Sequence, residues 1–288
     1  IALTFLMVHA APGGPFDNER ALPADVEANI QRAYHLDEPL PKQFARYLSG
    51  LLRGDLGPSY RLRDFTVSEL IGLTFPLSMK LGALAMALAI VVGVGAGTAA
   101  ALRQGSYLDR WIMAFSMTGI SVPVFVVAPI LVLLFAVKLQ WLPVGWSSTT
   151  GASRLVLPVI TLALPQIAYI ARLTRASMID VLARDFIRTA RAQGLGMLTV
   201  IRLHALKPAL LPVLSYMGPA IAAILTGSVV VEEVFGIPGL GQSFVRGALN
   251  RDYTLVLGIV VFYATLIVSL NLIVDVLYGV IDPRVRYR

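Results

Sequence analysis

Residues 75–102 read FPLSMKLGALAMALAIVVGVGAGTAAAL. This stretch decides the fold because it is a long apolar run in which Lys80 is the single charged residue. A helix rises 1.5 Å per residue, so about 20 apolar residues cross the roughly 30 Å hydrocarbon core of a bilayer. The stretch is therefore long enough for a membrane span. The glycines in GVGAG (93–97) resemble a glycine-rich loop that binds nucleotides. Gly93 and Gly97 lie inside the apolar run, however, which argues against a loop there. Small residues four apart in such a run favour close contact between helices.

Further apolar runs of comparable length follow this stretch. They are Trp111–Val137, Leu155–Ala171, Ala209–Val231 and Thr254–Ile281. The opening residues Ile1–Ala11 are apolar too, but eleven helical residues reach only about 16 Å. We expect them to be the end of a truncated first helix. A signal peptide is the alternative, because small residues at Val8-His9-Ala10 suit a signal peptidase. The predicted fold is an all-α polytopic membrane protein with six transmembrane helices.

Composition and charge agree with this fold. Hydrophobic residues make up 57% of the chain and charged residues 14%, and the mean hydropathy is +0.74. The basic residues lie at the ends of apolar runs rather than among exposed aromatics, so the net charge of +7 does not indicate nucleic-acid binding. One set of short loops holds twelve Lys and Arg residues and the opposite set four. The positive-inside rule then predicts a multi-pass protein of the cytoplasmic (inner) membrane with both termini in the cytoplasm.

The segment 12–74 falls on the external side in this topology. Its apolar residues recur at helical spacing, first at Val26, Ile30 and Tyr34 and then at Leu40, Phe44, Leu48, Leu51 and Leu52. Short amphipathic helices at the membrane surface fit this pattern. Thr66 and Glu69 form a predicted capping box that opens the next helix, and Pro76 is a predicted kink inside it. Residues 75–288 then form a core of five helices.

Motifs for catalysis or metal binding are missing from the sequence. No lysine follows a glycine, so there is no phosphate-binding loop for ATP. The three histidines, His9, His35 and His204, are far apart, and no serine lies in a strained nucleophile turn. We expect no catalytic residue, no metal site and no cofactor in this chain.

The most informative segment is the long cytoplasmic loop at 173–208. Asp185 can cap a short helix over 186–193, and Gly194 can end that helix in a left-handed turn. A second short helix is predicted at Met197–Leu206, stopped by Lys207-Pro208. Two basic helices joined at a glycine make a compact knob that can fit a groove on another protein. The alternative is that positive-inside bias alone placed the arginines there.

The motifs in this loop and elsewhere resemble those of the permeases of binding-protein-dependent ABC importers. The loop itself, DFIRTARAQGL at 185–195 followed by His204-Ala205-Leu206 and Pro212, is similar to the EAA loop of that family. Further matching segments are PFDNERALP (15–23), RGDLG (53–57), GISVP (119–123), VFGIPGLG (234–241), NRDY (250–253) and DPRVR (282–286). Together they resemble the oligopeptide and dipeptide branch, and most closely the first of its two oligopeptide permease subunits.

The resemblance implies a type I importer fold, a set of partners and a coupling role for the loop. The partners would be a second, homologous permease subunit, two ABC ATPase subunits, an extracytoplasmic peptide-binding protein, the peptide substrate and membrane lipid. The implied ATPase-coupling residues are Asp185, Arg188, Thr189, Ala190, Arg191, Ala192, Gly194, Leu195 and His204. The wider family begins its motif with glutamate where this chain has Arg188, so an ion pair of that glutamate is not carried over. ATP hydrolysis is expected in the partner subunits.

Polar and kink-forming residues inside the spans are candidates for the transport path. They are Ser121, Pro123, Tyr216, Met217, Pro219 and Thr226. Glu232 and Glu233 could meet a peptide or the binding protein outside, although solvation of both is the simpler expectation. An ion-coupled secondary transporter is the alternative function, but Lys80 and Asp275 lie toward the ends of spans rather than in the middle. The resemblance would also fit an importer permease for another substrate, such as dipeptides, nickel or glutathione.

Overall fold

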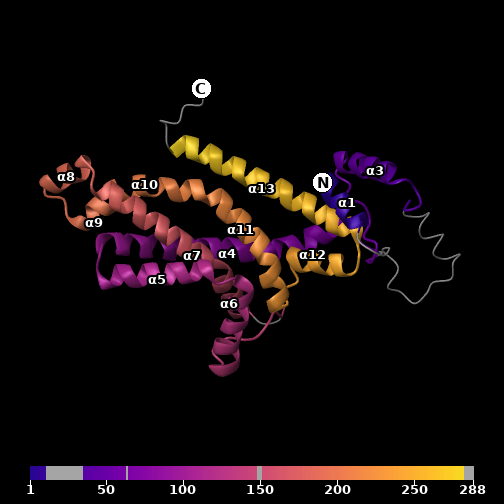
Figure 1. Ribbon diagram of the computed structural model, residues 1–288, viewed down its shortest axis with the longest axis horizontal. Helices are drawn as coiled ribbons and strands as arrows, with labels where there is room; N and C mark the ends of the chain where they lie inside the picture. Colours follow the sequence, from indigo (N-terminus) through magenta and orange to yellow (C-terminus); the bar gives the residue numbers. More distant parts are fainter. Residues whose placement is uncertain (11–34, 63, 148–150, 282–288) are drawn as a thin grey trace. The chain divides into compact units, whose positions relative to one another are not determined.

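The computed structural model describes residues 1–10, 35–62, 64–147 and 151–281. Regular structure in these ranges is helical, apart from an isolated antiparallel bridge between Pro58 and Thr66 (Figure 1). The chain divides into two compact units. Unit 1 comprises residues 1–78 and 238–265, and unit 2 comprises residues 79–237 and 266–288. The helices α4 (Val67–Leu102) and α13 (Tyr253–Ile281) begin in unit 1 and end in unit 2.

Within the described residues, four helices are long and apolar enough to cross a membrane, and they correspond to predicted spans. They are α4, α7 (Ser153–Leu182), α11 (Leu211–Phe235) and α13, which is apolar from Tyr253 to Val276. Three of them, α4, α7 and α11, run several residues beyond one end of the apolar stretch that predicted them, and α13 differs from its stretch by one residue. The helix α1 (Ala2–Ala10), at nine residues, reaches only about 14 Å and cannot span alone. The prediction that it belongs to a first transmembrane helix stays a prediction.

The predicted span at 111–137 is broken by a sharp bend. The chain forms α5 (Tyr107–Ser121) and then α6 (Val124–Leu131) continued by the π-helical turn η1 (Val132–Lys138), and the two parts meet at 108°. Val122 is extended, at φ −89° and ψ 119°, because the residue before a proline is driven out of the helical region. Pro123 also has no backbone N–H for the helical ladder. The pair counts as a fifth span only if the bent segment is one crossing.

Unit 1 has its own apolar core where the first turns of α4 meet the first turns of α13 and the short helix α12 (Leu240–Leu249). Its buried members are Val67, Leu70, Ile71, Leu240, Leu255 and Ile259. The Ser78 hydroxyl in α4 accepts a hydrogen bond of 2.8 Å from the backbone N–H of Leu240, which fixes the start of α12. The sequence analysis had not predicted α12.

Amphipathic structure in the predicted external segment is confirmed in part. The helix α3 (Leu40–Leu52) covers the second group of apolar residues. The first group, Val26, Ile30 and Tyr34, lies outside the described residues. The capping box is confirmed, because the Thr66 N–H donates to Glu69 Oε2 at 2.8 Å and the Glu69 N–H donates to Thr66 Oγ1 at 3.2 Å.

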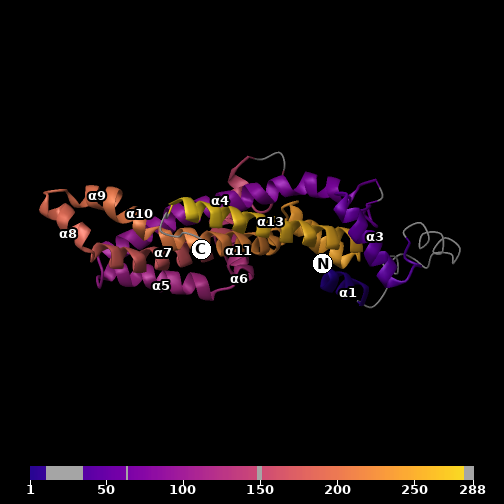
Figure 2. The same cartoon turned by 90° about the horizontal axis from the view of Figure 1, so that it is seen from above.

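Unit 2 is built around α7, against which α5, α6 and α11 pack. Figures 1 and 2 both show α5 and α11 running beside α7. The predicted glycine contact is confirmed at α4, since a Cβ on Gly93 would lie 2.9 Å from Ile170 Cβ. A Cβ on Gly97 would lie 2.5 Å from the Ala171 carbonyl oxygen. Only glycine therefore allows α4 to approach α7 this closely.

Candidate functional site

The loop after α7 folds into the short helices α8 (Asp185–Ala192), α9 (Met197–Val200) and α10 (Leu206–Ala209), with the π-helical turn η2 (Ile201–Ala205) before α10. Gly194 follows α8 at φ +84°, which confirms the predicted left-handed turn. Its N–H donates to the Arg191 carbonyl at 2.9 Å, and the Leu195 N–H donates to the Ala190 carbonyl at 3.3 Å. This hydrogen bonding closes α8 and turns the chain toward α9. We name residues 185–209 the knob.

Two details of the predicted knob are wrong. Asp185 does not cap α8 but is its first helical residue, and Arg184 occupies the cap position without a side-chain hydrogen bond. The Asp185 carboxylate instead accepts from Arg188 at 3.3 Å, with both side chains exposed. The second helical stretch also runs past Pro208 to Ala209. The π-helical turn just upstream shifts the pattern of backbone hydrogen bonds, so the helix continues although Pro208 has no N–H to donate.

The inner face of the knob packs firmly on unit 2. Ile187 and Ala190 of α8 are buried in one cluster with Met178 and Val181 of α7 and Val200 of α9. Ala190 is therefore a packing residue rather than a surface contact. Because α7 continues into this cluster, a force applied to the knob acts directly on α7.

The outer face of the knob is both basic and apolar. Most of the predicted coupling residues are exposed there, namely Asp185, Arg188, Thr189, Arg191, Ala192, Gly194 and Leu195, while His204 is half-buried. Large apolar side chains lie among them, including Leu198 and Leu203, which is 69% exposed. Exposed apolar side chains rimmed by charge are typical of a protein contact surface. The Arg191 guanidinium also lies 2.9 Å from Met197 Sδ, which links α8 to α9.

A buried ion pair that the sequence analysis missed joins α5 to α7. Arg175 Nε and Nη2 donate to the two carboxylate oxygens of Asp109 at 2.5 and 2.7 Å. The Asp109 side chain is only 5% exposed and also accepts from the Gly105 N–H at 2.9 Å. A bidentate pair of this kind fixes both distance and orientation. The two helices are thus tied together near the end of α7 that leads to the knob.

The predicted path residues lie on two elements of unit 2. Ser121 and Pro123 flank the break between α5 and α6, where both are exposed. The hydroxyls of Ser121 and Thr226 donate to their own helices, at Met117 and Ala222, as lone hydroxyls in membrane helices commonly do. On α11, Pro219 and Thr226 are exposed, and Tyr216 and Met217 are half-buried. Tyr216 alone among the six donates a side-chain hydrogen bond to another helix, reaching Gln166 Oε1 at 2.9 Å in the described residues.

The expectation that Glu232 and Glu233 are both solvated is wrong for Glu232. Its side chain is 0% exposed, on the same face of α11 as the buried Ser228 and Phe235. Glu233 is exposed and stays a candidate for external contact. The helix ends just beyond them at Gly236, which has φ +64°, and the Ile237 N–H donates to the Glu232 carbonyl at 2.8 Å.

A buried carboxylate in unit 1 joins NRDY, one of the segments that carried the family resemblance, to the residues that follow another, RGDLG. Asp252 caps α13, accepting from the Leu255 N–H at 3.2 Å. The same carboxylate accepts from the Ser59 hydroxyl and from the Tyr60 N–H at 3.2 Å. Thr254 Oγ1 adds a hydrogen bond of 2.6 Å to the Pro58 carbonyl. The segment after RGDLG is thus fastened to NRDY at the start of α13.

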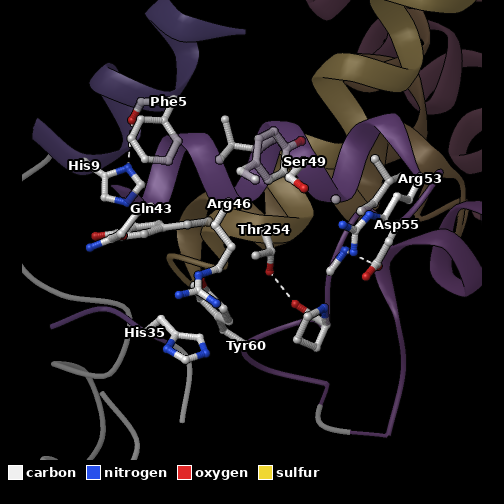
Figure 3. Close-up of a pocket in the computed structure, with 17 residues that line it drawn as sticks. Phe5, His9, His35, Gln43, Arg46, Ser49, Arg53, Asp55, Tyr60 and Thr254 are labelled. Carbon is white, nitrogen blue, oxygen red and sulfur yellow. Dashed lines mark hydrogen bonds between the residues drawn. The ribbon is translucent and has the colours of Figure 1, made fainter. Parts of the chain in front are cut away.

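A pocket of about 490 Å³ lies beside this junction within unit 1. Figure 3 shows its lining, which comes from α1, from His35, from α3 and the loop after it, and from the start of α13. Hydrogen bonds from Arg46 and Lys42 hold the pKa of the nearby Glu38 carboxyl below its usual value. Burial raises the pKa of Tyr47 to about 12, and its hydroxyl has no hydrogen-bond partner among the described residues.

Comparison with known proteins places these features in a family. Residues 89–287 match the family described as "Binding-protein-dependent transport system inner membrane component". The chain belongs to this family. It is 54% identical over 287 residues to the "Oligopeptide transport system permease protein OppB" of Salmonella typhimurium, covering 100% of this chain and 94% of that protein. The protein of the same name from Haemophilus influenzae is 53% identical over 288 residues, with the same coverage.

A solved structure supports the fold. The chain superposes on a chain of the MetNI methionine ABC transporter in an inward-facing conformation with a TM-score of 0.63 and 16% sequence identity. The superposition covers 75% of this chain and 97% of that one. The predicted all-helical membrane fold of the type I importer kind is therefore confirmed.

Proposed function

We propose that this chain is a permease subunit that forms half of the translocation path of an ATP-driven oligopeptide importer. Family membership supports the membrane role, and the names of the similar permeases support oligopeptides as cargo. The observation that carries the proposal is the knob, a basic and apolar surface whose inner face packs on α7 through Ile187 and Ala190. Such a surface suits a groove on a partner that delivers force.

The proposed assembly contains a second homologous permease subunit, two ABC ATPase subunits and an extracytoplasmic peptide-binding protein. ATP hydrolysis belongs to the ATPase subunits, and this chain contributes motion rather than chemistry. Both termini lie in the cytoplasm, on the side to which the basic loops assign the knob. The chain is a multi-pass protein of the cytoplasmic membrane, surrounded elsewhere by lipid.

Coupling follows from how the knob is attached. When the ATPase subunits close, they press on the exposed face of α8, and the buried cluster beneath it passes the movement to α7. The Asp109–Arg175 pair makes α5 move with α7. Tightly packed elements shift between discrete arrangements rather than deforming continuously, so the path alternates between inward-facing and outward-facing states.

The coupling role is tested by Gly194→Val. A β-branched residue at φ +84° is strained by about 1 to 2 kcal/mol, and relief of that strain rotates α9 relative to α8. Gly196→Val is the matched control, because Gly196 has φ −62° and an added Cβ there meets nothing within 4 Å. In reconstituted vesicles, Gly194→Val should lose peptide uptake while subunit amounts stay normal. Coupled uptake at the level of Gly196→Val would show that force is transmitted elsewhere.

Charge at the docking surface is tested separately with Arg191→Glu. If the ATPase groove is acidic, the reversal should weaken retention of the ATPase subunits during purification, and added salt should weaken the wild-type contact too. If positive-inside bias alone explains this arginine, retention stays unchanged.

Cargo is tested by competition. Uptake of a labelled oligopeptide should be inhibited by unlabelled oligopeptides, and much less by dipeptides, nickel or glutathione at the same concentration. Stronger inhibition by one of these three would reassign the substrate while leaving the permease role intact.

A further inference from the structure

A row of polar side chains on α7 keeps hydrogen-bond donors that helix packing does not use. Gln166, Tyr169 and Arg172 follow one another at three-residue spacing. Gln166 is only 7% exposed, while Tyr169 is 39% exposed and Arg172 is also exposed. The Arg172 guanidinium carbon lies 5.7 Å from the centre of the Tyr169 ring, within the range of a cation–π contact. The three side chains therefore form one continuous row.

Tyr216 of α11 holds this row in place. Its ring stacks on that of Tyr169, with centroids 4.2 Å apart and planes inclined by 15°. Its hydroxyl donates to Gln166 Oε1 at 2.9 Å. The oxygen of the Gln166 amide is thus engaged, and the end of the amide that remains for a ligand is its NH₂ donor.

All three members of the row offer donors. These are the Gln166 NH₂, the Tyr169 hydroxyl and the Arg172 guanidinium, and none has a hydrogen-bond acceptor within the part of the chain that the structure describes. Gln166 and Tyr169 lie within the apolar stretch Leu155–Ala171 and Arg172 follows directly after it, so donors without an acceptor are costly there unless they face protein or a polar path. The row therefore faces something that supplies acceptors.

A peptide main chain supplies acceptors of the right kind. Each residue has a carbonyl oxygen whatever its side chain, and the C-terminus has a carboxylate that suits a guanidinium. From Gln166 to Arg172 the helix rises about 9 Å, which matches two to three residues of extended peptide at about 3.3 Å each. Contacts to the main chain would also tolerate cargo of varied sequence.

We propose that Gln166, Tyr169 and Arg172 contact the main chain and the C-terminal carboxylate of the transported peptide, and that Tyr216 positions the first two. The inference rests on the proposed function and specifies a site for it. Arg172 receives the carboxylate because it is the cation of the row. Gln166 and Tyr169 donate to main-chain carbonyls, which gives the peptide a defined direction along α7.

The test compares two peptides that differ only at the C-terminus, one with a free carboxylate and one with a carboxamide. Each is taken up by reconstituted vesicles with the same binding protein, and the uptake rate of a variant is divided by that of wild type. Because both rates are measured with the same binding protein, the ratio removes any preference of that protein for the acid or the amide. Arg172→Gln should lower uptake of the free acid about tenfold or more and change uptake of the amide little.

Three further variants complete the test. Arg172→Lys keeps the charge and should restore most of the preference for the acid, whereas Arg103→Gln removes an exposed basic residue from the turn after α4 and should affect neither peptide. Tyr216→Phe keeps the stacked ring but releases Gln166, and should slow uptake of both peptides. An equal effect of Arg172→Gln on acid and amide, or no effect, would overturn the inference while wild-type uptake still supports the proposed function. Absence of wild-type uptake would overturn both.

Discussion

The closest approach of a glycine to the backbone of a neighbouring helix gives the sharpest test of the packing in unit 2. In Gly97→Ala, the new Cβ would lie 2.5 Å from the Ala171 carbonyl oxygen and 2.7 Å from Thr174 Cβ. Ordinary contact begins at 3.4 Å, so α4 and α7 must separate by about 1 Å. The nearest atom belongs to the backbone of α7 and cannot rotate away. Overpacking of this kind costs about 1 to 3 kcal/mol.

The matched control lies in the same helix. An added Cβ on Gly95 meets nothing within 4 Å, so Gly95→Ala keeps only the gain of about 0.5 to 1 kcal/mol from replacing glycine in a helix. Because both variants share that gain, the difference between them isolates the packing cost. Each kcal/mol of lost stability lowers the melting temperature by about 2 to 4 °C. The packing cost of about 1 to 3 kcal/mol should therefore make Gly97→Ala unfold about 2 to 12 °C below Gly95→Ala. The measurement is thermal unfolding of the purified complex in detergent, and equal melting temperatures would refute the close contact.

Three other predictions concern the ion pair, the topology and the external junction. Arg175→Gln leaves the buried Asp109 without its cation and should destabilise the protein by about 3 kcal/mol, whereas adding Asp109→Asn should recover part of the loss in the same unfolding assay. A cysteine at the exposed Asp64 should react with an impermeant thiol reagent from outside, and one at the exposed Gln104 only after permeabilisation; the reverse pattern would invert the topology. Asp252→Ala removes a helix cap and a loop anchor together, so it should speed proteolysis of the external loop, and an unchanged cleavage rate would contradict that role.

Local patterns in the sequence were enough to predict the features that depend on residues close together in the chain. The apolar runs located the long helices, the capping box at Thr66 formed as predicted, and Gly194 adopted the predicted left-handed turn. Each of these depends on residues within a few positions of one another. Their physical causes, namely burial in lipid, capping and backbone freedom, act locally.

Features set by distant residues were missed or wrong. Asp109 and Arg175 are 66 positions apart, and each alone looked like an ordinary loop charge. Glu232 was expected to be solvated, but it is buried. Its burial depends on which face of α11 turns inward, and residues far away in the sequence determine that face. The bend at Pro123 shows a different limit, since a proline predicts a kink but not an angle of 108°. For the site, the sequence located the knob and Tyr216 but not their packing partners on α7.

The Asp252 junction has a consequence for biogenesis. Its partner Ser59 precedes it by 193 residues, so during synthesis the loop around Ser59, which the proposed topology puts outside, emerges long before the carboxylate that fastens it. At about 5 to 20 residues per second, the delay is about 10 to 40 s. Throughout that interval the loop lacks this anchor, and a chain that ends before Asp252 never gains it. A protease on the external side could therefore distinguish finished from unfinished chains by this loop alone.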